Sequence, residues 1–232
     1  MPALRLRLMD GFALESSRGS IQLPVGLQRL LAFLALRGPA HRYVVAGTLW
    51  PEVPDAHALA SLRTGVWRMN RILPGVIQVR GAALLAQENM SVDSRDQEEL
   101  TTRVMRDVDE RGLGDGLDCI WLAELLPGWY DDWVVLERER LSQLRLHALE
   151  HLAMVMTRGH QLEAALQFAL EAFHAEPLRE TANAALMEVY LAEGNISSAV
   201  HHYELFRDLL RRELDLEPSP GLQRLLPEQA LR

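Results

Sequence analysis

The hydrophobic period in the first third of the chain changes from strand-like to helical and back, and this order constrains the fold most. Residues 4–8 read Leu-Arg-Leu-Arg-Leu, an alternation typical of a half-buried strand. Two more short strands are expected at 12–15 and 20–23. From Val25 onward, leucines recur at helical spacing until Gly38-Pro39 ends the pattern. We therefore expect a small antiparallel sheet that is followed by helices.

Prolines and glycines divide the next segment into three helices and a hairpin. The predicted helices cover residues 25–37, 43–50 and 57–73. The strands predicted at 76–79 and 83–85 are joined by Arg80-Gly81, a turn signal. A sheet, three helices and a terminal hairpin form the winged helix-turn-helix plan, in which the second helix supports the third and the hairpin is the wing.

The third helix has two contrasting faces when residues are placed about 100° apart. Its predicted core face consists of Leu59, Leu62, Val66, Met69 and Leu73. The opposite face carries Thr64, Trp67, Arg68 and Arg71, with Ser61 and Arg63 on its flanks. No acidic residue lies between Ala56 and Leu73, whereas an ordinary solvated helix usually mixes both signs of charge. This composition favours a helix that enters the phosphate-lined major groove of DNA.

Two further residues of the predicted interface allow more than one interpretation. Trp67 lies at the edge of the exposed arc, so it packs against the wing or touches DNA. Arg80 at the hairpin tip is a candidate contact to the minor groove or to phosphate, although an isolated arginine at a tip is often merely solvated. The predicted DNA-binding set is therefore Ser61, Arg63, Thr64, Trp67, Arg68, Arg71 and Arg80.

The basic residues are all arginine, which excludes several enzyme classes. The sequence has 24 basic residues and no lysine, so it lacks the lysine of a Walker A loop, of a pyridoxal enzyme and of a protein kinase. Residues 1–95 hold 11 arginines against 6 acids, a net charge of +5, while residues 96–232 have a net charge of −13. This asymmetry indicates a nucleic-acid-facing part that is joined to a part that avoids nucleic acid, although chance segregation between two ordinary domains gives the same pattern.

The second part of the chain is predicted to be entirely helical. A polar stretch at 87–95 marks the boundary, which gives a winged-helix domain at 1–93 and a helical domain at 94–232. The helices are expected at about 96–111, 119–126, 132–158, 160–174, 178–193, 196–213 and 220–226. Gly159 and Gly194 are 35 residues apart, as are Ala164 and Ala199, and Phe168 and Tyr203. This repeat is typical of tetratricopeptide units, which stack into surfaces for protein contacts, so the expected fold is mainly α.

Several stretches resemble the Streptomyces antibiotic regulatory proteins. In the first domain these stretches are Leu49-Trp50-Pro51-Glu52, Ala60-Ser61-Leu62-Arg63-Thr64, Trp67-Arg68 and Leu73-Pro74-Gly75. In the second they are residues 126–133 (Leu-Pro-Gly-Trp-Tyr-Asp-Asp-Trp), 137–140 (Glu-Arg-Glu-Arg), 176–180 (Glu-Pro-Leu-Arg-Glu) and 213–218 (Glu-Leu-Asp-Leu-Glu-Pro), which resemble the bacterial transcriptional activator domain of that family. The resemblance covers nearly the whole chain, in order.

This resemblance implies a pathway-specific transcriptional activator that acts on a secondary-metabolite or similar gene cluster. Members of the family bind tandem direct repeats in double-stranded DNA beside a promoter, as a homodimer would, and recruit RNA polymerase with its sigma factor. Larger members add an ATPase domain, so a chain of this length is expected to be a short-form member. A cytoplasmic location, no membrane contact and no cofactor are expected with this role.

Other motifs in the sequence point less convincingly to chemistry. The run His147-Ala-Leu-Glu-His151 matches a zinc protease pattern, but it lies within a repeat helix and has no partner carboxylate. The acids at 107–118 mimic a calcium loop, but Arg111 occupies a ligand position. The glycines at 112–116 do not make a dinucleotide site, because no strand precedes them. Cys119 is predicted to be a buried residue that only packs in the core. We therefore expect no metal site and no enzyme activity.

A function of a different class remains open from the sequence. The helical repeats would bind a protein or peptide, and the winged helix would dock protein rather than DNA. The net charge of +5 on residues 1–95 is modest for a DNA-binding domain, which favours this scaffold hypothesis. Salt-dependent retention on bulk DNA would distinguish the two.

Overall fold

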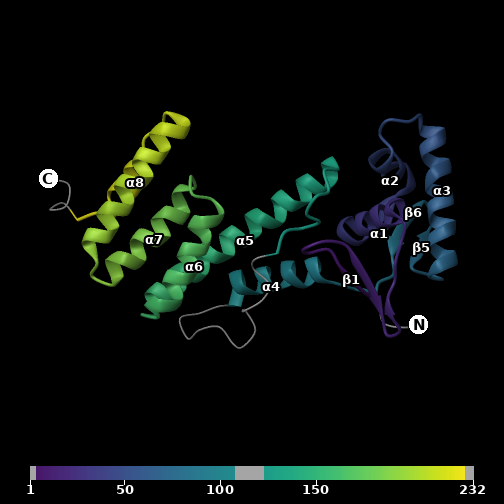
Figure 1. Ribbon diagram of the computed structural model, residues 1–232. Helices are drawn as coiled ribbons and strands as arrows, with labels where there is room; N and C mark the ends of the chain where they lie inside the picture. Colours follow the sequence, from purple (N-terminus) through teal and green to yellow (C-terminus); the bar gives the residue numbers. More distant parts are fainter. Residues whose placement is uncertain (1–3, 108–122, 228–232) are drawn as a thin grey trace. The chain divides into compact units, whose positions relative to one another are not determined.

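The computed structural model describes residues 4–107 and 123–227, which divide into two compact units. The first unit combines Met1–Glu99 with Leu122–Leu141, and the second combines Leu100–Trp121 with Ser142–Arg232. Figure 1 shows strands and helices in the first unit and helices in the second. The chain is thus mainly helical, with small sheets in the first unit.

The N-terminal sheet of the first unit has the strand order β3-β2-β1-β7. Its strands are β1 (Leu4–Arg7), β2 (Ala13–Ser16), β3 (Gly19–Ser20) and β7 (Ser91–Val92). The alternation predicted for the first strand is confirmed, because Leu4 and Leu6 are buried while Arg5 and Arg7 are exposed. The strand predicted at 20–23 is wrong beyond Ser20. The polar boundary segment supplies β7, which pairs in parallel with β1 through only two residues and was therefore too short to detect as a strand.

The three predicted helices and the hairpin are present. The helices are α1 (Val25–Arg37), α2 (Arg42–Leu49) and α3 (Asp55–Ile72). The hairpin consists of β5 (Ile77–Arg80) and β6 (Ala83–Ala86), and β4 (Ala40–His41) completes a three-stranded sheet of order β4-β6-β5. At the end of α1, Gly38 has φ +71°, a left-handed conformation that favours glycine. This order of elements confirms the winged helix-turn-helix plan.

The first unit also contains a segment from much later in the chain. Met9 forms an isolated bridge with Leu125, and the Leu126 amide donates to the Leu8 carbonyl at 2.8 Å. The helix predicted at 119–126 is therefore wrong over 123–126, because these backbone groups pair with the end of β1 instead of with one another. Residues 119–122 lie outside the described part of the chain.

The beginning of α5 (Asp132–Arg158) packs on the same unit. The rings of Trp133 and Phe33 meet edge to face with their centroids 5.3 Å apart. Arg138 donates to the carbonyl oxygens of Leu125 and Leu126 at 2.8 and 2.7 Å. The compact unit thus extends beyond the boundary that we predicted at residue 93, although that domain boundary itself stays a prediction.

Helix α4 (Asp93–Asp107) begins at a carboxylate that fastens it to the end of β1. The Asp93 carboxylate accepts hydrogen bonds from the amides of Leu8 and Met9 at 2.8 and 3.1 Å. Burial raises the pKa of this carboxyl, and the backbone donors act in the opposite direction. This contact positions the first turn of α4 against the N-terminal sheet.

The second unit contains the remaining helices, close to their predicted ranges. They are α6 (Leu162–Ala175), α7 (Glu180–Ala192), α8 (Ile196–Leu214) and the short α9 (Pro220–Gln223). Of the repeat positions, Ala199 and Tyr203 are buried, while Ala164 and Phe168 are half-buried. Consecutive packing of α6, α7 and α8 with small buried residues agrees with the helical repeat that we predicted.

Candidate nucleic-acid interface

Helix α3 packs on α2 and α1 through a narrow strip of small and apolar residues. Ala58, Leu62 and Met69 are buried, and a Cβ on Gly65 would lie only 3.3 Å from Leu30 Cδ2. The absence of a side chain at Gly65 therefore lets α3 and α1 approach closely. The rest of the predicted core face, Leu59, Val66 and Leu73, is half-buried rather than buried.

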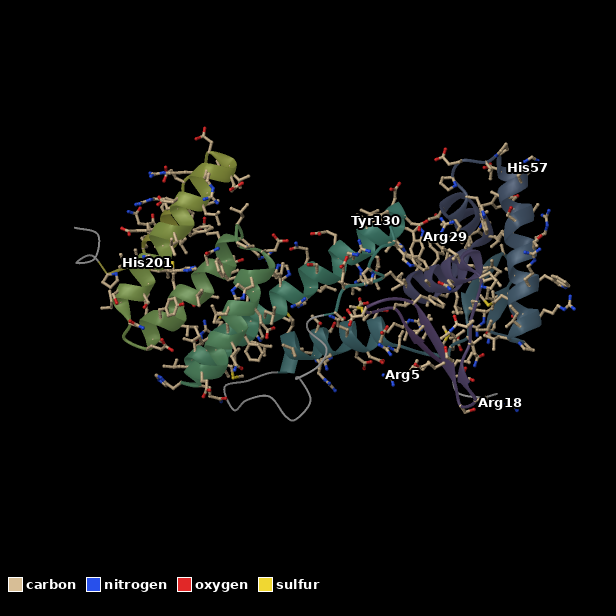
Figure 2. All side chains as sticks on the ribbon, in the orientation of Figure 1. Arg5, Arg18, Arg29, His57, Tyr130 and His201 are labelled. Carbon is tan, nitrogen blue, oxygen red and sulfur yellow. The ribbon has the colours of Figure 1, made fainter. Side chains whose placement is uncertain are left out.

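The opposite face of α3 is exposed, as its sequence predicted. Arg63, Thr64, Trp67, Arg68 and Arg71 are exposed, and Ser61 is half-buried. Figure 2 shows His57 at the N-terminal end of α3 and side chains that project outward along this helix. Within the described residues, Arg63 and Arg68 have neither an ion-pair nor a hydrogen-bond partner. The face therefore carries uncompensated positive charge.

Three side chains of α3 have local contacts that limit how each meets a ligand. The guanidinium carbon of Arg71 lies 5.1 Å from the centroid of the Trp67 ring, a cation–π contact. The Thr64 hydroxyl donates to the Ala60 carbonyl at 3.0 Å, which occupies its proton. Thr64 therefore presents a lone pair and a methyl group outward, not a donor.

Arg80 lies at the tip of the hairpin, where the sequence placed it. Gly81 follows with φ +61°, a conformation that suits glycine in this tight turn. Arg80 Nη2 forms an ion pair with Glu88 Oε1 at 3.0 Å, and both side chains remain more than half exposed. Such a pair contributes little stability and leaves the guanidinium accessible, but Glu88 reduces the net charge of the tip.

The sequence did not single out two residues at the start of α2 that belong to the same surface. Arg42 Nη2 donates to the Gly81 carbonyl at 3.2 Å, so it joins α2 to the hairpin turn. Tyr43 is 60% exposed and its ring stacks on His41, with centroids 5.5 Å apart. A basic residue beside an aromatic one is the only local signal, and it is too common to predict a site.

Grooves lie on both sides of α3. One, of about 350 Å³, is lined by Arg42, Tyr43, Leu59, Leu62, Arg63, Val66, Trp67, Val79 and Leu84. The other, of about 470 Å³, is lined by Pro24, Gly26, Leu27, Trp50, Ala60, Ser61, Thr64, Gly65 and Arg68. Trp67 lines the first groove together with Val79 of the wing and is also exposed. A position against the wing and a position accessible to DNA, the two interpretations of its sequence position, are therefore compatible.

The motifs that suggested other chemistry have structural partners or lie outside the described residues. Glu150 of the zinc-like motif accepts hydrogen bonds from Arg179 Nε at 2.7 Å and from the Thr181 hydroxyl at 2.6 Å. Across residues 4–107 and 123–227, no group of three metal-ligating side chains is present. Cys119, the glycines at 112–116 and nearly all of the calcium-like loop are outside the described residues. Among the described residues, no helix has the length and hydrophobicity needed to cross a bilayer.

Comparison with known proteins decides the family. Residues 94–230 match the family model of the bacterial transcriptional activator domain. The chain belongs to this family. The chain is also similar to the regulatory protein AfsR of Streptomyces coelicolor, with 34% identity over 215 residues, which cover 84% of this chain and 21% of AfsR. AfsR of Streptomyces griseus is 31% identical over 229 residues, which cover 90% of this chain and 23% of that protein.

The chain therefore spans about a fifth of the length of these regulatory proteins. Its fold is similar to that of Mycobacterium tuberculosis EmbR, solved in complex with a low-affinity phosphopeptide. The TM-score is 0.73 at 18% identity, over 99% of this chain and 67% of the EmbR chain. The resemblance to the Streptomyces antibiotic regulatory proteins and the fold class that it implied are confirmed.

Proposed function

We propose that this member of the bacterial transcriptional activator domain family activates transcription by binding double-stranded DNA through α3 and the β5–β6 wing. The observation that carries the proposal is the exposed face of α3, where Arg63 and Arg68 have no partner within the described residues. Exposed arginines without an internal counter-ion attract the phosphates that line a DNA groove.

The surroundings of α3 suggest roles for five of the seven predicted residues. With α3 in the major groove, Arg63 or Arg68 reads guanine as a bidentate donor, and Thr64 meets an amino group or a thymine methyl because its proton is occupied. Arg80 at the wing tip and Arg42 beside it contact phosphates, which position the protein but carry no sequence information. Ser61 at the edge of α3 forms a hydrogen bond to the adjacent sugar-phosphate backbone of the DNA.

The helical unit contributes contacts other than DNA in this proposal. The second unit, residues 100–121 and 142–232, holds 11 arginines against 18 acids, a net charge of −7, so DNA repels it. We assign it to protein contacts, with RNA polymerase and its sigma factor and between two copies of the chain. Tandem direct repeats suit such a pair, because each copy then places one α3 in one repeat. The protein then acts in the cytoplasm.

The test compares two arginines of equal charge on the full-length chain. Elution from a column of immobilised bulk DNA is measured against salt for the unaltered chain, Arg68→Ala and Arg18→Ala. Arg18 is exposed in the loop between β2 and β3, remote in sequence from α3, and serves as the matched control. On bulk DNA no particular base is read and the Arg68 guanidinium contacts phosphate, so we expect Arg68→Ala to elute earlier and to lower the salt slope by about one unit, with no change for Arg18→Ala.

Two results would contradict this assignment. An equal decrease for both variants would mean that net charge alone causes retention and that α3 has no special role. No salt-dependent retention of the unaltered chain would favour the alternative, in which the winged helix docks protein and the chain is an interaction scaffold.

A further inference from the structure

The groove between α3 and the wing has the form of a small-molecule site. Its volume of about 350 Å³ lies within the usual range for ligand pockets, about 300 to 1,000 Å³. Leucine and valine side chains of α3 and the hairpin line it, and Tyr43 and Trp67 add two aromatic rings. Ligand sites are typically apolar with a few polar groups that fix orientation, and this groove has that composition.

Both aromatic side chains of the groove are held by a contact of their own. Tyr43 stacks on His41 with an interplanar angle of 10°, and Trp67 carries the Arg71 guanidinium 5.1 Å from its ring centroid. Yet the two rings are 60% and 58% exposed, which is unusual for residues of this size. Rings that are fixed and exposed offer a flat ligand stacking surface at a low entropic cost.

The charge of the groove specifies the sign of its ligand. Its lining contains Arg42 and Arg63 and no acidic residue. Arg42 Nε is buried and has no hydrogen-bond partner, although Nη2 of the same side chain reaches the Gly81 carbonyl. The buried Nε is closed to solvent and to a ligand, so a carboxylate would meet the other N–H groups of this guanidinium through charge-assisted hydrogen bonds. Arg63, which has no partner within the described residues, adds a second cation on the same groove.

We propose that this groove binds a small planar aromatic acid, with its ring against Tyr43 and Trp67 and its carboxylate at Arg42 and Arg63. The proposal goes beyond DNA binding, and the ligand site itself does not depend on it. Because Arg63 and Trp67 also belong to the proposed DNA face, the bound acid competes with DNA. This competition, unlike the binding, rests on the proposed function.

The test uses 1-naphthoate as the probe and the neutral 1-naphthylmethanol as its matched control, titrated calorimetrically into the full-length chain without DNA. We expect saturable binding of the acid and binding of the alcohol that is at least about tenfold weaker, because the alcohol cannot accept as a carboxylate does. Arg63→Ala and Trp67→Ala each weaken binding of the acid, Trp67→Phe restores most of the loss, and Tyr130→Ala, which alters an exposed ring outside the groove, changes nothing.

Three outcomes overturn the site. They are no saturable binding of the acid, equal affinity for the alcohol, and unchanged binding in both groove variants. If the acid does not bind but Arg63→Ala and Trp67→Ala still reduce retention on DNA, the groove belongs to the nucleic-acid interface alone. A second arm then measures whether a saturating concentration of the acid releases the chain from DNA. Binding without release keeps the site and rejects the competition.

Discussion

The α3 surface and the junction of α6 with α7 use the same residue type in opposite ways. On α3, Arg63 and Arg68 are exposed and unpaired within the described residues. At the junction, Arg179 donates to Glu150 at 2.7 Å and to Gln143 at 2.8 Å, with its side chain 22% exposed. Arg179 therefore joins helices of the second unit, whereas Arg63 and Arg68 join no elements of the first unit.

This difference separates stability from recognition in a chain without lysine. A guanidinium that is paired inside the fold has its donors saturated and cannot serve a ligand. One that projects without a partner contributes nothing to folding but keeps its fork of donors for phosphate or a base edge. Partners, rather than composition, therefore distinguish structural arginines from those that stay available to a ligand.

The largest effect on stability is expected where a paired arginine is removed. Arg179→Ala leaves the half-buried Glu150 carboxylate with only the Thr181 hydroxyl, at a cost of about 2 kcal/mol in the free energy of unfolding. Urea unfolding of the full chain, followed by circular dichroism, measures this cost. Arg68→Ala is the matched control and should change stability by less than about 0.5 kcal/mol. Equal costs for the two variants would erase the contrast between the regions.

The reverse ranking is expected for DNA affinity. Arg68→Ala should weaken binding to a specific site by about 1–3 kcal/mol if this arginine reads a guanine. Arg179→Ala should leave affinity unchanged in conditions where it is folded. Fluorescence anisotropy with a genomic fragment selected for binding to the unaltered chain measures both. A loss of affinity in Arg179→Ala as large as that in Arg68→Ala would place the recognition surface elsewhere.

The sequence was most informative where a long periodic pattern decided the structure. The exposed face of α3 followed from an 18-residue helix whose polar side held no acid after its first residue. Two-residue strands such as β4 and β7 carry no period and escaped prediction. The error at 123–126 has a different cause, because Leu125 and Leu126 are apolar enough for a buried helix but pair with the end of β1. Tertiary hydrogen bonds, invisible in local pattern, decided that segment.

The candidate site divides in the same way. Residues within α3 were predictable, whereas Arg42 and Tyr43 reach the surface because α2 begins beside the hairpin turn. No spacing within the sequence encodes that adjacency. The ion pair of Arg80 with Glu88 was likewise unpredictable, since it joins a hairpin tip to the segment that follows β6. Faces of a single element could therefore be predicted from the sequence, whereas contacts between elements could not.

A smaller effect is expected in the polar interior of the second unit, where pairing again decides the role. His202 is buried, its Nε2 lies 2.9 Å from Asn183 Oδ1, and the Asn183 amide donates to the carbonyls of Pro177 and Arg179. Because Oδ1 must accept, His202 carries its proton on Nε2. Burial, with a further contribution from His201, lowers the pKa of His202 below its ordinary value of 6.5.

The direction of the pH effect follows from this lowered pKa. Below pH 6.5 the unfolded chain binds a proton at this position that the folded chain refuses, so stability is full above that pH and decreases as the pH falls toward the folded pKa. His202→Gln should reduce the decrease, and His147→Gln, at an exposed position, should not. Urea unfolding between pH 7 and 5 and an NMR titration of the His202 ring test this. A His202 pKa at or above the ordinary value would contradict it.

The smallest effect concerns Trp67, through which the unpaired surface acquires some internal order. The cation–π contact holds the Arg71 guanidinium in a limited range of positions before DNA arrives, so part of its entropy loss occurs on folding. Trp67→Ala should weaken DNA binding by about 0.5–1 kcal/mol through Arg71, and Trp67→Phe should recover part of that loss because Phe also offers an aromatic face. A double-mutant cycle with Arg71→Ala isolates the coupling: if the ring positions the arginine, the two losses are less than additive. Fully additive losses would mean that Trp67 and Arg71 contact DNA separately.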